Sequence, residues 1–346
     1  MITKTAPALQ RSIEIREQIP AKKDWQTALA EAIRDPHELL RQLQLSDSSL
    51  AHKLSDTSFP LRVTHSFIQR MQPGDPDDPL LRQVLPTRAE SLDPEWGRLD
   101  PVGDQAAMRE AGLIHKYAGR VLLVSTAACA IHCRYCFRQH FPYQQANPLG
   151  SQWPASLAYL KSQTDIHEVI LSGGDPLSLT DERLTRLISQ LDQVPQLQTL
   201  RIHTRLPVVL PQRITTQLLE WIHNTRLSVV FVLHINHPNE INQELVDALR
   251  PLQNAGVILL NQAVLLREIN DTPEALIQLS HKLFAAGILP YYLHQLDRVR
   301  GAAHFEVSEQ RGRDLLDSMR QALPGYLVPK YVKEIPGNAA KSPIFG

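Results

Sequence analysis

β-rich runs and helical patterns alternate along residues 121–296, and this alternation most restricts the folds open to the chain. After the first interval, the runs begin about 30 residues apart, which is the rhythm of βα units. The sequence therefore predicts an α/β fold whose parallel sheet is either open and doubly wound or curled into a barrel. The predicted strands are Val121 to Thr126, Glu168 to Ser172, Thr199 to Thr204, Ser228 to Ile235, Val257 to Leu266 and Leu289 to Leu296. The predicted helices are Asp181 to Gln193, Ile214 to His223, Asn239 to Ala255 and Thr272 to Ala286.

Polar side chains and glycines follow several of these strands. In either kind of parallel sheet, ligands gather at the carboxyl ends of the strands, so one shared mouth is expected to collect these groups. They are Gly173-Gly174-Asp175, His203, His234, Gln262 and Asp297.

The first hundred residues have a different character. Apolar residues recur at helical spacing in Trp25 to Leu45, and breakers such as Pro73-Gly74-Asp75-Pro76 interrupt the pattern. We expect a mostly helical N-terminal extension over residues 1–100, a βα domain over 101–305 and a short C-terminal segment over 306–346.

Charge and hydropathy exclude several classes of protein. The chain has 36 basic and 36 acidic side chains, a balance that indicates neither nucleic-acid binding nor a polybasic membrane anchor. No apolar stretch approaches the roughly 20 residues that span a bilayer, and Met1 to Lys23 lacks the apolar core of a signal peptide. The 3 cysteines lie within eight residues, which does not suit a disulfide framework. We expect a cytoplasmic protein in a reducing compartment.

The cysteines form the segment Cys129-Ala-Ile-His-Cys133-Arg-Tyr-Cys136. Three thiolates this close can bind three irons of a cubane cluster, and the fourth iron is left open because the chain has no other cysteine. An open metal position favours catalysis over a closed structural site. Two alternatives are a zinc site completed by His132 or His140, and a chance cluster of free cysteines.

This cysteine spacing, with the aromatic Tyr135 before the last cysteine, resembles the radical S-adenosylmethionine superfamily. The resemblance implies a [4Fe-4S] cluster on Cys129, Cys133 and Cys136 whose open iron binds S-adenosylmethionine and releases a 5′-deoxyadenosyl radical. It also implies a partial (β/α)6 TIM-like barrel over residues 101–305. In that family, the segment with Gly173, Gly174 and Asp175 packs along the methionine part of the cofactor, and glycines permit such close approach.

Residues 100–346 resemble lysine 2,3-aminomutase more closely. Moving an amino group between adjacent carbons needs a radical initiator and a group that stabilises the migrating nitrogen, which an imine of pyridoxal phosphate supplies. In the resemblance, Lys341 forms that imine, and Lys116 and Arg120 are cations for the cofactor phosphate. The stretches that carry the resemblance are Cys133-Arg-Tyr-Cys136-Phe-Arg138, Leu171-Ser-Gly-Gly-Asp-Pro176, His234-Ile-Asn-His-Pro238, Leu260-Asn-Gln-Ala-Val-Leu265 and Pro336-Gly337-Asn-Ala-Ala-Lys341.

The resemblance also implies how a lysine substrate binds. Arg138 aligns with the arginine that binds the α-carboxylate, a role that suits a planar guanidinium. Asp297 and Glu334 align with two acids for the distal ammonium, although the family has an aspartate where this chain has Glu334. His234 and Gln262 match positions near the two cofactors.

The chain resembles one bacterial branch of the family, because only Ser-Pro-Ile-Phe-Gly follows Lys341. That branch makes (R)-β-lysine for the modification of elongation factor P, so the expected partners are L-lysine, a flavodoxin or ferredoxin reductant and the elongation factor P lysyl-ligase. Neither a nucleic acid nor a membrane is expected as a partner. Alternatives are a 2,3-aminomutase for another amino acid or a protein-attached lysine, and an electron-transfer iron-sulfur protein.

Overall fold

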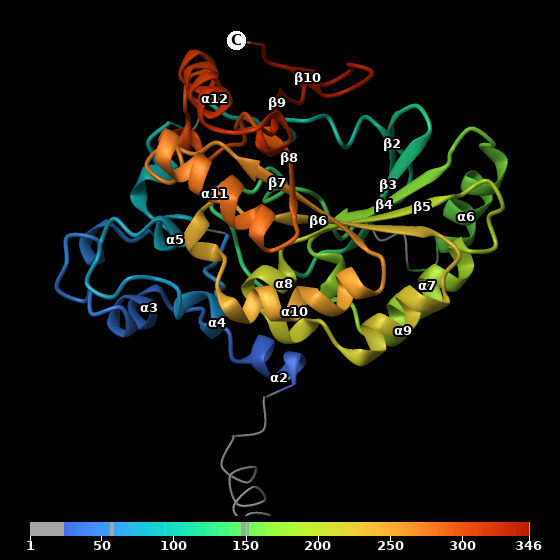
Figure 1. Ribbon diagram of the computed structural model, residues 1–346, viewed down its shortest axis with the longest axis horizontal. Coiled ribbons are helices and arrows are strands. Elements are labelled where there is room, and N and C mark those ends of the chain that lie inside the picture. Colours follow the sequence, from blue (N-terminus) through green and yellow to red (C-terminus); the bar gives the residue numbers. More distant parts are fainter. Residues whose placement is uncertain (1–23, 56–58, 94, 147–149, 151, 346) are drawn as a thin grey trace, which may run out of the picture.

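A long sheet forms the centre of the molecule in the computed structural model, which describes residues 24–55, 59–93, 95–146, 150 and 152–345 (Figure 1). Six neighbouring strands of this sheet are parallel and follow one another in chain order. They match the six predicted strands, and the sheet has two edges, so the expected α/β fold with a partial barrel is confirmed. These strands are β3 (Arg120–Thr126), β4 (Glu168–Gly173), β5 (Thr199–Thr204), β6 (Ser228–His234), β7 (Ile258–Val264) and β8 (Leu289–His294).

Short strands that the sequence analysis missed extend the sheet at both edges. At one edge, β1 (Met108–Glu110) and β2 (Leu113–Tyr117) run antiparallel, and β2 pairs with β3. At the other edge, β9 (Lys330–Lys333) is parallel to β8 and pairs with β10 (Ser342–Pro343). The β9–β10 hairpin carries the C-terminal segment back to the sheet.

Helices connect the parallel strands, and α7, α9 and α10 lie together along the outside of the sheet (Figure 1). Each of the long helices predicted from the sequence begins at a polar cap: the Thr180 side chain accepts from the backbone of Arg183, and Thr272 precedes Pro273. In α7, buried leucine and isoleucine residues recur at helical spacing toward the sheet. The helices of this part are α6 (Trp153–Ser162), α7 (Asp181–Leu191), α8 (Leu206–Val209), α9 (Thr216–Asn224), α10 (Gln243–Asn254), α11 (Pro273–Ala285) and α12 (Glu309–Ala322).

The N-terminal extension consists of helical turns joined by irregular chain. The pattern expected over Trp25 to Leu45 forms two helices rather than one, because Asp35 caps a new helix that begins with Pro36. Residues 1–23, where no signal peptide is expected, lie outside the described part. The elements are α2 (Trp25–Ala30), α3 (Pro36–Gln42), η2 (Ala51–Lys53), α4 (His65–Ile68), α5 (Pro79–Arg82) and η3 (Arg88–Ser91).

The extension packs against the barrel, and its buried side chains share one continuous hydrophobic core with those of the strands. It also holds the cysteine loop, because the backbone of Arg62 accepts a hydrogen bond from His132 and that of Gln83 accepts one from Arg134. The Arg134 side chain forms an ion pair with Glu90. The division of the chain at residues 100 and 305 stays a prediction.

Within the described ranges, none of the helices has the length and apolar character needed to cross a bilayer.

Candidate active site

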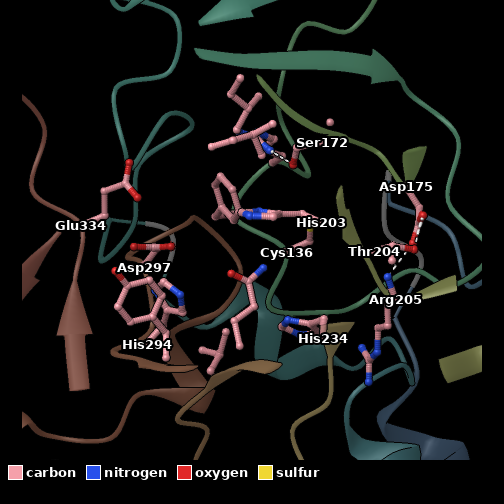
Figure 2. A pocket seen from close by; sticks show the side chains of 18 of the residues that line it. Cys136, Ser172, Asp175, His203, Thr204, Arg205, His234, His294, Asp297 and Glu334 are labelled. Atoms are coloured by element: carbon pink, nitrogen blue, oxygen red, sulfur yellow. Dashed lines mark hydrogen bonds between the residues drawn. The ribbon is translucent and has the colours of Figure 1, made fainter. Parts of the chain in front are cut away.

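A cavity of about 510 Å³ opens between the cysteine loop, the inner face of the parallel strands and the β9–β10 hairpin. Its volume suits small molecules rather than a macromolecular partner. Figure 2 shows side chains from several of these elements converging on it. Every residue predicted for the site lines this cavity: Lys116, Arg120, Cys129, Cys133, Tyr135, Cys136, Arg138, Gly173, Gly174, Asp175, His234, Gln262, Asp297, Glu334 and Lys341.

The three cysteines are free thiols on the loop that follows β3. Burial raises the pKa of Cys136 to about 11 and that of Cys129 well above its ordinary value, and the nearby thiols add to both shifts. The Arg205 guanidinium donates a hydrogen bond to the sulfur of Cys133 over 2.8 Å. The pocket therefore presents three sulfurs and a buried cation.

The donor set fits a cluster better than a single ion. Among the residues the structure describes, no group of three His, Cys, Asp or Glu side chains is arranged to hold one metal ion. A cubane requires less proximity, because each thiolate binds a different iron. The two histidines of the zinc alternative face elsewhere: His132 Nδ1 lies 2.7 Å from the Pro60 carbonyl oxygen, and His140 Nε2 lies 3.2 Å from that of Arg300.

Tyr135 lies in a buried polar network behind the cysteines. Its hydroxyl is 2.6 Å from Asn236 Nδ2, 2.7 Å from Arg205 Nη1 and 2.9 Å from His234 Nε2. Glu240, which is fully buried, accepts a hydrogen bond from the Arg205 guanidinium over 2.9 Å and balances its charge. This network holds the cysteine loop at one end of the cavity and places Tyr135 beside His234, a contact that the sequence analysis did not predict.

The Gly173-Gly174-Asp175 segment ends β4 and packs against the start of the cysteine loop, where the backbone nitrogens of Gly174 and Asp175 donate hydrogen bonds to the carbonyl oxygens of Thr126 and Ala128. Gly173 has a φ of +113°, and a Cβ on Gly174 would lie 2.5 Å from the carbonyl oxygen of Ala128, so both positions require glycine. The Asp175 carboxylate accepts hydrogen bonds from the Thr204 hydroxyl and the backbone nitrogen of Arg205, each over 2.7 Å. Asp175 therefore holds the ends of β4 and β5 together, and its contact with a cofactor stays a prediction.

A continuous chain of charges runs across the other end of the cavity. Asp104 accepts from Arg138 Nε over 2.7 Å and from Lys116 Nζ over 2.6 Å. Lys116 also reaches Glu334 over 2.8 Å, and Glu334 accepts from Lys341 Nζ over 3.1 Å. The predicted carboxylate-binding arginine is thus linked to the predicted cofactor lysine through Asp104, which sequence reasoning missed.

The two acids expected to bind an ammonium differ electrostatically. Burial and the neighbouring Glu334 raise the pKa of Asp297 to about 7. Burial would also raise the pKa of Glu334, but Lys341 and Lys116 lower it to about 2. Glu334 is therefore ionised and already paired, whereas Asp297 is close to half protonated at neutral pH.

Arg120 and Gln262 line the cavity from β3 and β7. The Arg120 guanidinium lies 4.7 Å from the centre of the Tyr117 ring. Within the described residues, Arg120 has no carboxylate partner, whereas Lys116 has two. The positive charge of Arg120 is therefore not neutralised by a carboxylate of the described residues, and it can attract an anionic ligand.

Comparison with known proteins identifies the family. A family model described as a 4Fe-4S single cluster domain matches residues 118–206, which include the three cysteines. L-lysine 2,3-aminomutase of Escherichia coli (strain K12) is 45% identical over 327 residues, covering 94% of this chain and 95% of that relative. The chain belongs to the lysine 2,3-aminomutase family. A more distant relative, L-lysine 2,3-aminomutase of Clostridium subterminale, is 33% identical over 325 residues, covering 93% of this chain and 77% of that relative.

Among solved structures, a radical SAM methyltransferase from Sphaerobacter thermophilus is similar with a TM-score of 0.45 and 16% identity, covering 64% of this chain and 68% of that chain.

Lysine 2,3-aminomutases are isomerases that use a [4Fe-4S] cluster, S-adenosylmethionine and, as a family, pyridoxal phosphate. The cavity of this family member has matching chemistry: three sulfurs at one end, and a lysine with an uncompensated arginine at the other.

Replacing Asp104 by asparagine is expected to lower the free energy of unfolding of this aminomutase family member by about 3 kcal/mol, because two buried cations lose their shared carboxylate. Thermal unfolding under anaerobic conditions measures the change. Glu182→Gln is the control, since Glu182 forms an exposed pair with Arg186 and is expected to change the stability by less than about 0.5 kcal/mol. A loss below about 1 kcal/mol for Asp104→Asn would contradict the bridging role.

Proposed function

We propose that this chain is a radical S-adenosylmethionine, pyridoxal phosphate-dependent aminomutase that converts free L-lysine to β-lysine. The observation that carries the proposal is that one cavity is lined by the three cysteines, Arg138 and Lys341. A 2,3-amino shift needs three things within one enclosed space: a radical initiator, a group that carries the migrating nitrogen, and residues that bind and orient the substrate. The 45% identity to an L-lysine 2,3-aminomutase over nearly the whole chain supports the substrate class.

In this proposal, Cys129, Cys133 and Cys136 hold the cluster. The guanidinium of Arg205, which donates a hydrogen bond to the Cys133 sulfur, would place a positive charge beside the bound cluster. S-adenosylmethionine would bind beside the cysteines, in the part of the cavity lined by Tyr135, His234, Gln262 and the Gly173-Gly174-Asp175 segment.

Lys341 and Arg120 hold pyridoxal phosphate in this proposal, Lys341 through its amine and Arg120 through the phosphate. Lys116 contributes to the same positive region, although its charge is shared with Asp104 and Glu334. When bound, the cluster with S-adenosylmethionine supplies a carbon radical, and pyridoxal phosphate stabilises the migrating nitrogen. Glu334 accepts a hydrogen bond from Lys341 Nζ in this structure, which supports a role in holding the amine of Lys341.

Arg138 orients the substrate in this proposal. Asp104 fixes its Nε, and the Ser172 hydroxyl accepts from its Nη1 over 2.9 Å. Arg138 is 5% exposed, so the rotation of its guanidinium is restricted, and the remaining N–H groups can bind an α-carboxylate. Asp297 then receives the distal ammonium. A protein-attached lysine would lack the free carboxylate that Arg138 is arranged to bind.

Lysine binding is expected to weaken as the pH falls below about 7. A bound ammonium favours the ionised form of Asp297, whose pKa is about 7 in the structure, so protonation competes with lysine. The affinity should fall by up to about tenfold per pH unit below that value and level off above it. The measurement is the dissociation constant of L-lysine as a function of pH.

Two controls accompany this pH titration. L-Norleucine has no distal ammonium and Asp297→Asn has no titrating carboxyl, so each should flatten the profile. A wild-type affinity that stays constant between about pH 6 and 8 would contradict the assignment of Asp297.

We further propose that the product is (R)-β-lysine, made for the elongation factor P lysyl-ligase. The resemblance to that branch supports this role, and relatives from E. coli and Haemophilus influenzae are 45% and 43% identical, against 33% for that of C. subterminale. A cytoplasmic location and a flavodoxin or ferredoxin reductant belong to the same proposal.

Anaerobic incubation of the cluster-loaded protein with L-lysine, S-adenosylmethionine, pyridoxal phosphate and dithionite tests the proposal. Chiral chromatography should show (R)-β-lysine. The S enantiomer would overturn the proposed branch. If 5′-deoxyadenosine formed without β-lysine, the substrate would instead be another amino acid or an attached lysine. No cleavage of S-adenosylmethionine would favour an electron-transfer protein.

A further inference from the structure

Strand β5 presents two unpartnered polar atoms to the cavity. Arg201 and His203 are two residues apart on this strand and both line the cavity, as side chains on one face of a strand do. Arg201 Nε and His203 Nε2 are buried, and neither has a hydrogen-bond partner among the described residues. Buried polar groups in native proteins nearly always have partners. Two such atoms on one cavity wall therefore indicate a ligand.

The surroundings of His203 define the chemistry of that ligand. Its neighbour on β6 is Val232, which has no polar side-chain group to offer. Arg138, Arg201 and Lys341 lie close enough to act on His203 electrostatically. The Arg201 charge is shared with Glu168, its ion-pair partner. Figure 2 shows the imidazole reaching into the same space as the side chains of Ser172 and Asp297. A positive environment with an unused nitrogen favours an anionic oxygen as the occupant.

We propose that His203 is a ligand-binding residue whose Nε2–H donates a hydrogen bond to an anionic oxygen, carried either by pyridoxal phosphate or by the carboxylate of the amino acid substrate. This inference deepens the proposed function and rests on it. His203 lies in the same cavity as Arg138 and Lys341, so both sources of the oxygen are within the site.

The protonation state of His203 agrees with this role. Burial, assisted by the positive charges of Arg201, Lys341 and Arg138, holds the pKa of His203 well below its ordinary value. The imidazole is therefore neutral at physiological pH and carries one proton. It supplies a hydrogen-bond donor without adding another positive charge to those of Arg201, Lys341 and Arg138.

The test compares two substitutions that separate the two ring nitrogens. The amide nitrogen of His203→Gln reaches the position of Nε2, whereas that of His203→Asn reaches only the position of Nδ1. The full-length, cluster-loaded protein is titrated with pyridoxal phosphate in the absence of lysine. The same variants, saturated with pyridoxal phosphate, are then titrated with L-lysine and with L-lysinamide, which lacks the carboxylate.

His203→Asn is expected to weaken one of the two ligands by at least about tenfold, and His203→Gln to stay within about threefold of the wild type. A loss in the first titration identifies the cofactor as the source of the oxygen. A loss for lysine but not for lysinamide identifies the substrate carboxylate. His115→Asn is the matched control, because the Nδ1 of His115 contacts the Tyr159 hydroxyl outside the cavity, and it should change neither affinity.

Equal affinities for His203→Asn and His203→Gln in both titrations, whether unchanged or equally weakened, would overturn the inference, since the donor position would then not matter. A wild-type protein that binds no pyridoxal phosphate would overturn the proposed function itself. Iron and sulfide content after anaerobic reconstitution should match that of the wild type in both variants, which shows that the fold and the cluster are intact.

Discussion

Replacing Lys341 by alanine is expected to lower the rate of β-lysine formation by about 10³-fold or more, because pyridoxal phosphate would lose the covalent attachment that we propose for Lys341. Lys341 lines the cavity, and its amine is held 3.1 Å from Glu334. Two measurements check this result: the rate of product formation, and mass spectrometry of the protein after borohydride reduction with pyridoxal phosphate. The wild type should carry the cofactor on Lys341 and the variant should carry none.

The matched control for Lys341 is Lys333→Ala. Lys333 belongs to the same C-terminal hairpin but forms its ion pair with Glu309, outside the cavity. This variant should keep both the modification and the activity. If Lys341→Ala retained a covalently bound cofactor, another amine would have to be the attachment site, and the assignment of Lys341 would fail.

Replacing Cys136 by alanine is expected to abolish both cluster assembly and the reductive cleavage of S-adenosylmethionine. A site that keeps only two of its three thiolates cannot hold a [4Fe-4S] cubane in place. The measurements are iron and sulfide content after anaerobic reconstitution, and the amount of 5′-deoxyadenosine formed with dithionite. Binding of pyridoxal phosphate should persist in the variant, since Lys341 lies on a different element.

His140→Ala on the same loop is the control for Cys136. Its Nε2 faces the carbonyl oxygen of Arg300, so the variant should retain the cluster. Full iron content in Cys136→Ala would contradict the three-cysteine site, and loss of bound metal in His140→Ala would support the zinc alternative.

The parallel core of the fold could be predicted because its signals are local. Each of the six predicted strands is found within a few residues of its expected ends, and capping residues such as Thr180 and Thr272 mark the following helices. The edge strands could not be predicted in the same way. In the β9–β10 hairpin, β9 has four residues and β10 has two. Such short strands carry no hydrophobic pattern of their own, and β9 forms by pairing with β8.

The chemical types in the site could be predicted, but their connections could not. The strand-end rule correctly predicted that His234 and Asp297 share one cavity with the cysteines. Asp104 lies in irregular chain with no periodic pattern, and its role depends on Arg138 and Lys116, which come from a loop and a different strand. Arg205 directly follows β5, so the strand-end rule would have identified it if applied to that strand.

We propose that this cavity moves the α-amino group of lysine to the adjacent carbon. The direct measurement uses L-lysine labelled with ¹⁵N at the α-amine and ¹³C at carbon 3, incubated anaerobically with the complete protein and its cofactors. The product is expected to contain a ¹³C–¹⁵N bond, visible as a one-bond coupling in the NMR spectrum. Recovery of β-lysine that lacks ¹⁵N together with free ¹⁵N-ammonia, or of unchanged lysine, would contradict it.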